Sequence, residues 1–226
     1  MDKLIALDQQ LLLLLNGRGP VWLDNLMWHF SSTWTWAPLI LLLLFVTLRS
    51  YTPRQFIVFL AALALAILLA DQLSAAILKP LFHRLRPTRE PGLMEMVRTV
   101  RGYRGGQYSF VSSHACNWLA VTTYLTLALR GRLLALSLAL VAALVCYSRI
   151  YLGVHYPGDI LCGAVLGFVV GLLTYQVFAI CFRWKEERPR LAGFRPTKGT
   201  QVRGRTLLVL AVCLTLICVC ALSFFC

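Results

Sequence analysis

The sequence predicts an all-α integral membrane protein: a bundle of six transmembrane helices preceded by a helical segment at the membrane interface. Of its 226 residues, 59% are hydrophobic and 14% are charged, whereas globular proteins average about 45–50% apolar and about 25% charged residues. The basic residues are grouped in short links between long apolar runs, which is typical of helical membrane proteins. Both observations favour a single membrane domain over residues 1–226.

The N-terminal segment, residues 1–31, is expected to lie along the membrane surface. Residues 3–15 form an apolar run that is too short to span a bilayer, which requires about 20 residues. Residues 21–31 carry Trp22 and Trp28 among polar side chains, and such aromatic segments favour the interface. Because no small-residue cleavage site follows the first leucine run, we expect no cleavable signal peptide.

Six further apolar runs have the composition of membrane spans. The third and fourth runs are short, so we expect their ends to continue into flanking arginine and tyrosine residues at the interface. The eight cysteines lie in or beside the apolar runs without metal-site spacing, and we interpret them as small buried hydrophobic residues. The six runs cover residues 34–48, 56–78, 113–129, 133–148, 157–182 and 206–225.

The formal net charge of +13 does not indicate a nucleic-acid partner, because the basic residues lie beside apolar runs. Alternating spans put Arg49, Arg130 and the basic residues 183–205 on one side, which the positive-inside rule assigns to the cytoplasm. The opposite side receives residues 79–112, a loop that is also rich in arginine. Since this loop departs from the rule, we expect its charges to have another task.

Three polar groups fall on that extracytoplasmic side. The third is the most unusual, because Arg149, His155 and Asp159 lie within eleven positions between two uncharged runs, and ionisable residues at a membrane edge indicate function. Taken singly, each group has an ordinary explanation: snorkelling basic residues, a helix N-cap, or an interfacial arginine. The groups cover residues 79–87, 109–114 and 148–159.

Together the three groups have the composition of a site for phosphoryl transfer through a covalent intermediate. Lys79, Arg86 and Arg149 are suited to neutralise phosphoryl oxygens, and Ser112 would add a donor where the next span begins. One histidine would attack phosphorus while the other protonates the leaving oxygen and then activates water. Asp159 would orient the attacking histidine. Because three cations can neutralise the charge and no carboxylate cluster suits Mg²⁺, we expect no metal ion and no cofactor.

The pattern of these groups resembles the type 2 phosphatidic acid phosphatase superfamily. The first group is Lys79, six residues, and then Arg86-Pro87, and the third is Ser148-Arg149, five residues, His155, three residues and Asp159. The resemblance covers roughly residues 56–182. It implies the six-helix bundle of the phosphatase and haloperoxidase type, with a site at the outer face of the membrane.

The resemblance also implies a role for each site residue. His155 would be the nucleophile, Asp159 its partner, and His114 the acid and base. The residues that would bind phosphate are Lys79, Arg86, Ser112, Ser113 and Arg149.

The second group departs from the family pattern at two positions. The family usually has Pro-Ser-Gly-His, whereas this chain has Val111-Ser112-Ser113-His114. Losing glycine removes a flexible backbone position close to the phosphate, and Ser113 offers a hydroxyl in its place.

By this resemblance, the chain is expected to be a metal-independent lipid phosphatase that hydrolyses a phosphomonoester or diphosphate through a phosphohistidine. Short loops leave little room for a large saccharide, so undecaprenyl diphosphate is the preferred substrate, with lipid A, phosphatidylglycerol phosphate and phosphatidic acid as alternatives. A lipid-to-lipid phosphotransferase and a non-catalytic lipid transporter or scaffold are the competing classes. The expected partners are a lipid phosphate substrate and membrane lipids, with no nucleic acid.

These interpretations divide the chain into four segments within an inner or plasma membrane, with the active site facing the periplasm or the outside. The segments are an interfacial region (1–31), a catalytic core (32–182), a basic cytoplasmic connector (183–205) and a last transmembrane helix (206–226).

Overall fold

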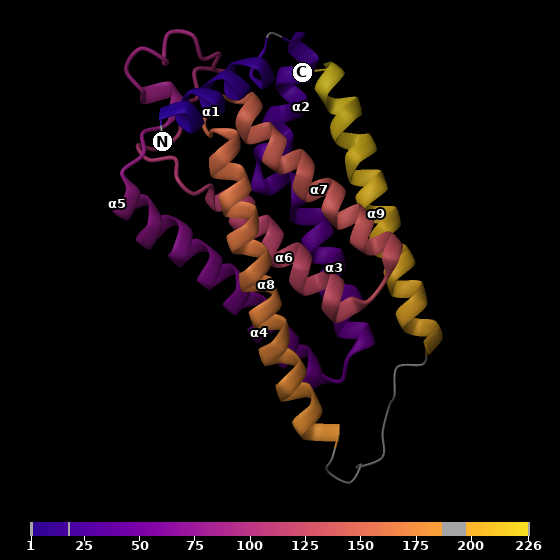
Figure 1. Cartoon of the computed structure of the whole chain (residues 1–226). Coiled ribbons are helices and arrows are strands. Elements are labelled where there is room, and N and C mark those ends of the chain that lie inside the picture. The colour runs from indigo at the N-terminus through magenta and orange to yellow at the C-terminus, as the bar shows by residue number, and fades with distance from the viewer. Residues whose placement is uncertain (1, 18, 187–197, 226) are drawn as a thin grey trace.

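The computed structural model describes residues 2–17, 19–186 and 198–225, and every regular element in these residues is helical. The elements form one elongated bundle (Figure 1), which confirms the predicted all-α architecture. Their bounds are α1 (Asp2–Leu15), α2 (Val21–Ser31), η1 (Thr33–Trp36), α3 (Ala37–Ser50), α4 (Pro53–Asp71), η2 (Gln72–Leu78), α5 (Lys79–Phe82), η3 (Pro87–Arg89), α6 (Ser113–Leu129), α7 (Arg132–Tyr151), α8 (Pro157–Glu186) and α9 (Lys198–Phe225).

Five helical stretches in the described part of the chain are long and apolar enough to cross a membrane. The remaining predicted span, the third apolar run (residues 113–129), forms α6, which has 17 residues, fewer than the usual span of about 20 residues. This helix packs against α4, α7 and α8, and its crossing of the membrane stays a prediction. The five stretches are Thr33–Ser50, Pro53–Phe82, Arg132–Tyr151, Pro157–Cys181 and Gly204–Phe224.

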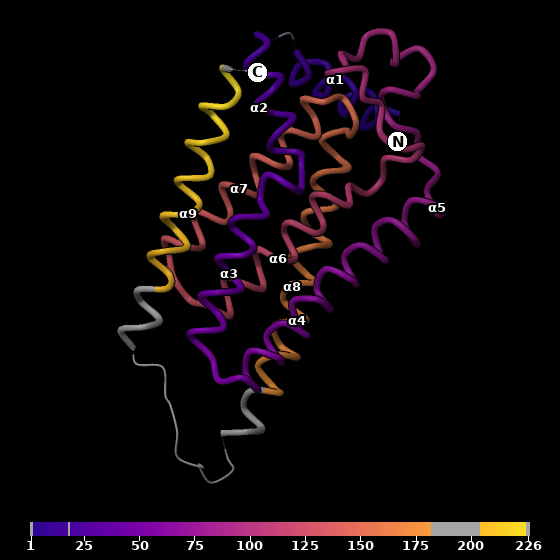
Figure 2. The backbone as a smooth tube through the Cα atoms, turned by 180° about the vertical axis from the view of Figure 1, so that it is seen from behind, coloured from indigo at the N-terminus to yellow at the C-terminus, as the bar shows by residue number. Residues whose placement is uncertain are grey.

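One end of the bundle gathers α1 and the loop that joins α5 to α6 (Figures 1 and 2). The buried Asn16, which directly follows α1, forms hydrogen bonds that connect these parts. Its Nδ2 donates to the carbonyl oxygens of Arg98 and Tyr151 at 3.1 and 2.6 Å, and its Oδ1 accepts from the Arg98 backbone N–H at 2.8 Å. The loop is therefore bonded to α1, while α1 is bonded to the end of α7. The interfacial placement of residues 1–31 stays a prediction.

Two expectations from the sequence need correction or restriction. Cys116 and Cys146 are buried, but five other described cysteines are exposed; a helix that faces lipid can carry such a small apolar side chain on its outer surface. Of the predicted connector, residues 187–197 lie outside the described residues. The helices beside it extend past the apolar runs, since α8 ends at Glu186 and α9 begins at Lys198.

Helix α8 packs closely against α6 because glycines recur every four residues along α8. A Cβ atom on Gly163 would lie 2.6 Å from the carbonyl oxygen of Ser112, and one on Gly171 would lie 2.6 Å from that of Ala120. At Gly167, a Cβ atom would overlap the backbone of Cys116. Small residues at this spacing let two membrane helices approach backbone to backbone, which fixes the register between α6 and α8.

We expect Gly167→Ala to destabilise the protein, because the added methyl group would meet the backbone of α6. Overpacking of this kind costs about 1–3 kcal/mol, and the unfolding temperature in detergent should fall accordingly. Val165→Leu is the matched control: it also adds one carbon, at a position of α8 that is 58% exposed, and should leave the unfolding temperature unchanged. Equal unfolding temperatures for the two variants would contradict the role assigned to this contact.

Candidate active site

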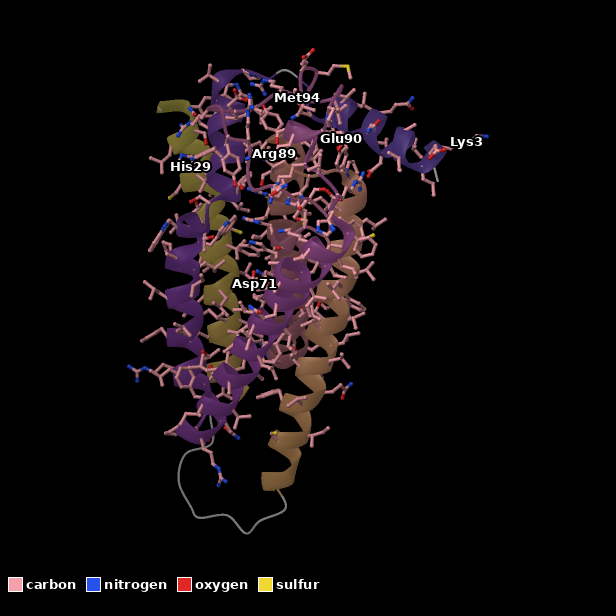
Figure 3. All side chains as sticks on the ribbon, turned by 90° about the vertical axis from the view of Figure 1, so that its left-hand side faces the viewer. Lys3, His29, Asp71, Arg89, Glu90 and Met94 are labelled. Atoms are coloured by element: carbon pink, nitrogen blue, oxygen red, sulfur yellow. The ribbon has the colours of Figure 1, made fainter. Side chains whose placement is uncertain are left out.

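The loop between α5 and α6 folds back on itself and covers one end of the bundle, where Figure 3 labels Arg89, Glu90 and Met94. The Arg86 N–H donates to the Gln107 carbonyl oxygen at 3.1 Å. A second backbone hydrogen bond lies beside it, in which the Ser109 N–H donates to the carbonyl oxygen of Arg84 at 2.8 Å. The two ends of the loop are thereby held side by side, which brings the first and second polar groups together.

Lys79 enters the site from the end of the long second span. The π-helical turn η2 precedes it, and such turns are frequent at functional sites. The Lys79 Nζ donates a hydrogen bond to the Ser113 Oγ at 2.8 Å. The serine that departs from the family pattern therefore contacts one of the predicted phosphate-binding cations.

Arg86 is almost completely buried, at 7% exposure. Its Nε donates to the Tyr108 carbonyl oxygen at 3.1 Å, and its Nη1 donates to the Val154 carbonyl oxygen at 3.2 Å. A Cβ atom on Gly105, where φ is +66°, would lie 2.6 Å from this Nη1, so only glycine fits beside the guanidinium. Burial, followed by the charge of Arg149, lowers the pKa of Arg86 from 12.5 to about 10.

Arg149 is buried near the end of α7, at 3% exposure. Its Nη1 donates to the Ser31 hydroxyl, and its Nη2 donates to the Tyr103 hydroxyl at 3.4 Å. Its Nε has no hydrogen-bond partner among the described residues. A buried guanidinium with a spare donor is poised to bind an anion.

His155 and Asp159 form a buried pair at the start of α8, with side-chain exposures of 1% and 0%. The His155 Nδ1 lies 3.4 Å from the Asp159 Oδ2, which is longer than an ideal hydrogen bond, and this Nδ1 has no hydrogen-bond partner among the described residues. The same Oδ2 accepts the Tyr156 backbone N–H at 3.0 Å. The carboxylate therefore lies beside Nδ1 and is held in place by the backbone.

Burial lowers the pKa of His155 well below its usual value of 6.5, and the charges of Arg86, Arg149 and Lys79 lower it further. These three cations therefore lie close enough to act on one imidazole. The same conditions keep the imidazole neutral at pH 7, and a neutral imidazole has the free electron pair that a nucleophile requires.

Ser112 and His114 lie at the start of α6. Ser112 is fully buried and caps the helix, since its Oγ accepts the Ala115 N–H at 3.4 Å. Its own N–H donates to the Asp159 carbonyl oxygen at 3.1 Å, so the starts of α6 and α8 are bonded to each other. His114 is half-buried and lies within electrostatic range of Arg149 and His155.

An apolar cavity of about 330 Å³ extends from His114 along the inside of the bundle. Leucine, isoleucine and tryptophan side chains dominate its lining, and the Asn117 Oδ1 has no hydrogen-bond partner among the described residues. The residues that line the cavity are Thr33, Trp36, Leu39, Ile40, Leu43, Leu63, Ile67, His114, Asn117, Trp118, Val121, Leu125, Leu129, Leu134, Leu138, Leu208 and Val212.

The structure brings the three predicted polar groups together at one end of the bundle, and it adds contacts from residues outside the eight candidate site residues. Ser31 and Tyr103 contact Arg149, while Arg84 and Asp8 contact the His155–Asp159 pair or its neighbours. Arg84 could have been suspected from its place inside the first motif. The other three lie outside all three motifs, and no local pattern marks them.

The chain also matches a known protein family. A family model described as the PAP2 superfamily matches residues 55–183. The chain belongs to the PAP2 superfamily. It is therefore a lipid phosphatase, a hydrolase that acts on lipid phosphate esters, and a multi-pass integral membrane protein. The resemblance inferred from the sequence is confirmed.

Among the relatives that match most of the chain are two lipid A 4′-phosphatases. A lipid A 4′-phosphatase from Porphyromonas gingivalis is 35% identical over 178 residues, which are 79% of this chain and 75% of that protein. A lipid A 4′-phosphatase from Bacteroides thetaiotaomicron is 34% identical over 219 residues, which are 96% of this chain and 95% of that protein.

Two solved structures share the fold of this PAP2 chain. The crystal structure of Aquifex aeolicus LpxE matches with a TM-score of 0.55 and 27% identity, over 74% of this chain and 93% of that one. A transmembrane PAP2-type phosphatidylglycerolphosphate phosphatase from Bacillus subtilis matches with a TM-score of 0.60 and 22% identity, over 84% of this chain and 90% of that one. The PAP2-type membrane fold is thereby confirmed.

His155 should make the stability of the protein depend on pH. Its pKa is well below 6.5 in the folded state, whereas an unfolded histidine binds a proton below about pH 6.5. The unfolded state then binds more protons, so this contribution is fully present above about pH 6.5 and decreases at lower pH, by up to about 1.4 kcal/mol per pH unit.

The check is the unfolding temperature in detergent, measured between about pH 7.5 and about pH 5 for the wild-type protein and for His155→Gln. We expect a steeper decrease in the wild-type protein, because glutamine does not titrate. Parallel curves would show that the pKa of His155 is the same in the folded and unfolded protein, which would contradict this prediction.

Proposed function

We propose that this chain removes a phosphate monoester from a lipid A type of glycolipid. One observation carries the proposal. Besides burial, the positive charges of Lys79, Arg86 and Arg149 all lower the pKa of the His155 imidazole. None of the three cations forms an ion pair among the described residues. A phosphate dianion would supply the missing negative charge.

The relatives favour lipid A over undecaprenyl diphosphate, the substrate preferred from the sequence. That preference rests on short loops, which leave little room for a large saccharide headgroup. However, this chain covers 95% of the length of the Bacteroides thetaiotaomicron lipid A 4′-phosphatase, so a protein named for lipid A is similar to this chain over nearly all of its own length. Short loops therefore do not argue against a glycolipid substrate.

In the first step, His155 attacks phosphorus. The Asp159 carboxylate lies beside Nδ1, which leaves Nε2 as the attacking nitrogen. A P–N bond forms while the bond between phosphorus and the lipid oxygen breaks, and His114 donates a proton to that oxygen. Lys79, Arg86 and Arg149 neutralise the charge on the phosphoryl oxygens, and Ser112 and Ser113 add donors at the start of α6.

In the second step, His114 takes a proton from water, and the oxygen of that water attacks phosphorus. The P–N bond breaks, which releases inorganic phosphate and restores a neutral His155. Three protein cations do the work that a metal ion does in other phosphatases, so we infer that the reaction needs no divalent metal.

The apolar cavity beside His114 supports a lipid substrate. A chain whose headgroup reaches His114 would place an acyl tail among the leucines of α3, α4 and α6. Each buried methylene group contributes about 0.8 kcal/mol, so a few carbons inside the cavity would contribute substantially to binding.

The position of the basic loop supports an active site on the extracytoplasmic side. Arg49 and Arg130 lie at the ends of α3 and α6. The loop and the α7–α8 turn lie at one end of the bundle, and the ends of α3 and α6 lie at the other (Figures 1 and 2). If the latter end is cytoplasmic, as the positive-inside rule indicates, the site faces the periplasm or the outside.

Phosphate release from a panel of lipid phosphates in detergent tests the proposed function. We expect lipid A to be hydrolysed faster than undecaprenyl diphosphate or phosphatidic acid, and we expect EDTA to have no effect. His155→Ala should lower the rate by about 10³-fold or more, and His114→Ala by about 10²–10⁴-fold.

A second experiment detects the covalent intermediate, because a phosphohistidine is stable in base and is hydrolysed in acid. After mixing with ³²P-labelled lipid, a base-stable phosphoprotein is expected in the wild-type chain and not in His155→Ala. Release that requires a divalent metal, or full activity in His155→Ala, would overturn the proposed mechanism. Transfer of the label to a second lipid instead of water would identify a phosphotransferase.

Filling the cavity should weaken binding of lipids with long tails. Leu63→Trp places a larger side chain in the cavity wall, so we expect KM for a long-chain lipid phosphate to rise about tenfold while activity on water-soluble p-nitrophenyl phosphate is retained. Ile57→Trp, at a position of α4 that is 66% exposed, is the matched control and should leave both unchanged. A similar loss on both substrates would show that the cavity does not hold the tail.

A further inference from the structure

Arg84 lies between two carboxylates at the edge of the active site. Its Nη1 donates to the Asp159 Oδ1 at 2.9 Å, and its Nη2 donates to the Asp8 Oδ2 at 2.7 Å. Asp159 belongs to the start of α8 and Asp8 to α1, so one guanidinium joins two elements that lie far apart in sequence.

The position of this guanidinium is fixed on several sides. Its Cζ atom lies 3.9 Å from the centre of the Tyr156 ring, a cation–π contact. The backbone carbonyl oxygen of Arg84 accepts hydrogen bonds from the Ser109 N–H at 2.8 Å and from the Ser109 Oγ at 3.2 Å. Both the side chain and the backbone of Arg84 are therefore held, and the fork cannot turn without losing several contacts.

Arg84 occupies the oxygen of Asp159 that does not face His155. Oδ1 accepts from Arg84, while Oδ2 accepts the Tyr156 N–H and lies 3.4 Å from the His155 Nδ1. A carboxylate with no solvent exposure is costly to bury unless a cation pairs with it. Arg84 supplies this charge and fixes the carboxylate orientation that puts Oδ2 beside the imidazole.

Asp8 accepts the hydrogen bond from the Arg84 Nη2 and also contacts α8 directly. Its Oδ1 accepts the backbone N–H of Gly158 at 2.7 Å, and a Cβ atom on Gly158 would lie 2.8 Å from its Oδ2. The start of α8 is therefore bonded to α1, although α1 lies outside residues 55–183, which the family model matches.

The geometry points to Arg84 as a positioning residue of the phosphatase reaction that acts through Asp159, with Asp8 of α1 as its anchor. Arg84 differs from Lys79, Arg86 and Arg149, because its two terminal nitrogens are engaged by carboxylates and its charge is balanced. It belongs to the orienting part of the site, and the N-terminal helix is part of the active-site structure. This inference rests on the roles proposed for His155 and Asp159.

The variants Arg84→Gln and Arg84→Lys test the inference by steady-state kinetics on the lipid phosphate that the wild-type chain hydrolyses fastest. We expect Arg84→Gln to lower kcat about 10- to 100-fold, the usual loss for an orienting partner, with KM within about twofold. Arg84→Lys keeps the charge but cannot bind both carboxylates with a planar fork. Its kcat should therefore lie between those of the wild type and Arg84→Gln. Asp8→Asn should lower kcat about three- to tenfold, because Arg84 would still contact Asp159.

Arg89→Gln is the matched control. It removes the same charge from the same loop (Figure 3), where Arg89 is exposed and donates to the carbonyl oxygens of Gly105 and Gly106, and its kcat should stay within about twofold of the wild type. The kcat values are compared only for purified variants whose unfolding temperature in detergent equals that of the wild type. If Arg84→Gln does not fold, Arg84→Lys and Asp8→Asn decide the matter, since wild-type kcat in both would overturn the inference.

Two results would contradict the positioning role. A rise in KM with unchanged kcat would mean that Arg84 contacts the substrate, and an equal effect of Arg84→Gln and Arg89→Gln would mean that only the charge of the loop matters. Failure of the proposed function is distinguishable, because it would appear as retained phosphate release in His155→Ala. Loss in His155→Ala together with wild-type kcat in Arg84→Gln would overturn the positioning role alone.

Discussion

The active site depends on the backbone contact between α6 and α8. Ser112 and His114 lie at the start of α6, and His155 and Asp159 lie at the start of α8. The hydrogen bond from the Ser112 N–H to the Asp159 carbonyl oxygen joins these two helix starts. Glycines along α8 allow this approach, since a side chain at Gly163 would meet the Ser112 backbone. Without the contact, the histidines would be on separate helices with nothing to hold their spacing.

The second constraint is electrostatic. The site concentrates positive charge in a buried volume, so that Arg86 has a lowered pKa and His155 remains neutral. Such an arrangement is unfavourable in the empty protein and favourable once an anion enters, because binding then supplies the charge that the fold leaves out. In the proposed mechanism the nucleophile and the phosphate-binding groups therefore support each other, because burial and the same cations that would bind the phosphate lower the pKa of His155.

The N-terminal helices complete this arrangement from outside the segment that carries the family motifs. Ser31 of α2 contacts Arg149, and Asp8 of α1 contacts both Arg84 and the backbone at Gly158. The proposed catalytic centre at the starts of α6 and α8 is in this way supported by helices at the end of the bundle. Bracing of this kind limits the motion of side chains whose distances the chemistry requires.

The sequence by itself determined the membrane class, the helix order and the eight candidate site residues, because hydropathy and ionisable residues at span ends are local signals. It did not determine the exposure of most cysteines or the contacts of Arg84 with Asp8 and Asp159. Those contacts join residues up to 76 positions apart, and no local pattern encodes them. Only the tertiary structure decided which arginine binds a carboxylate and which cations lack a counter-ion, since both follow from how the loop and α1 fold over the helix ends.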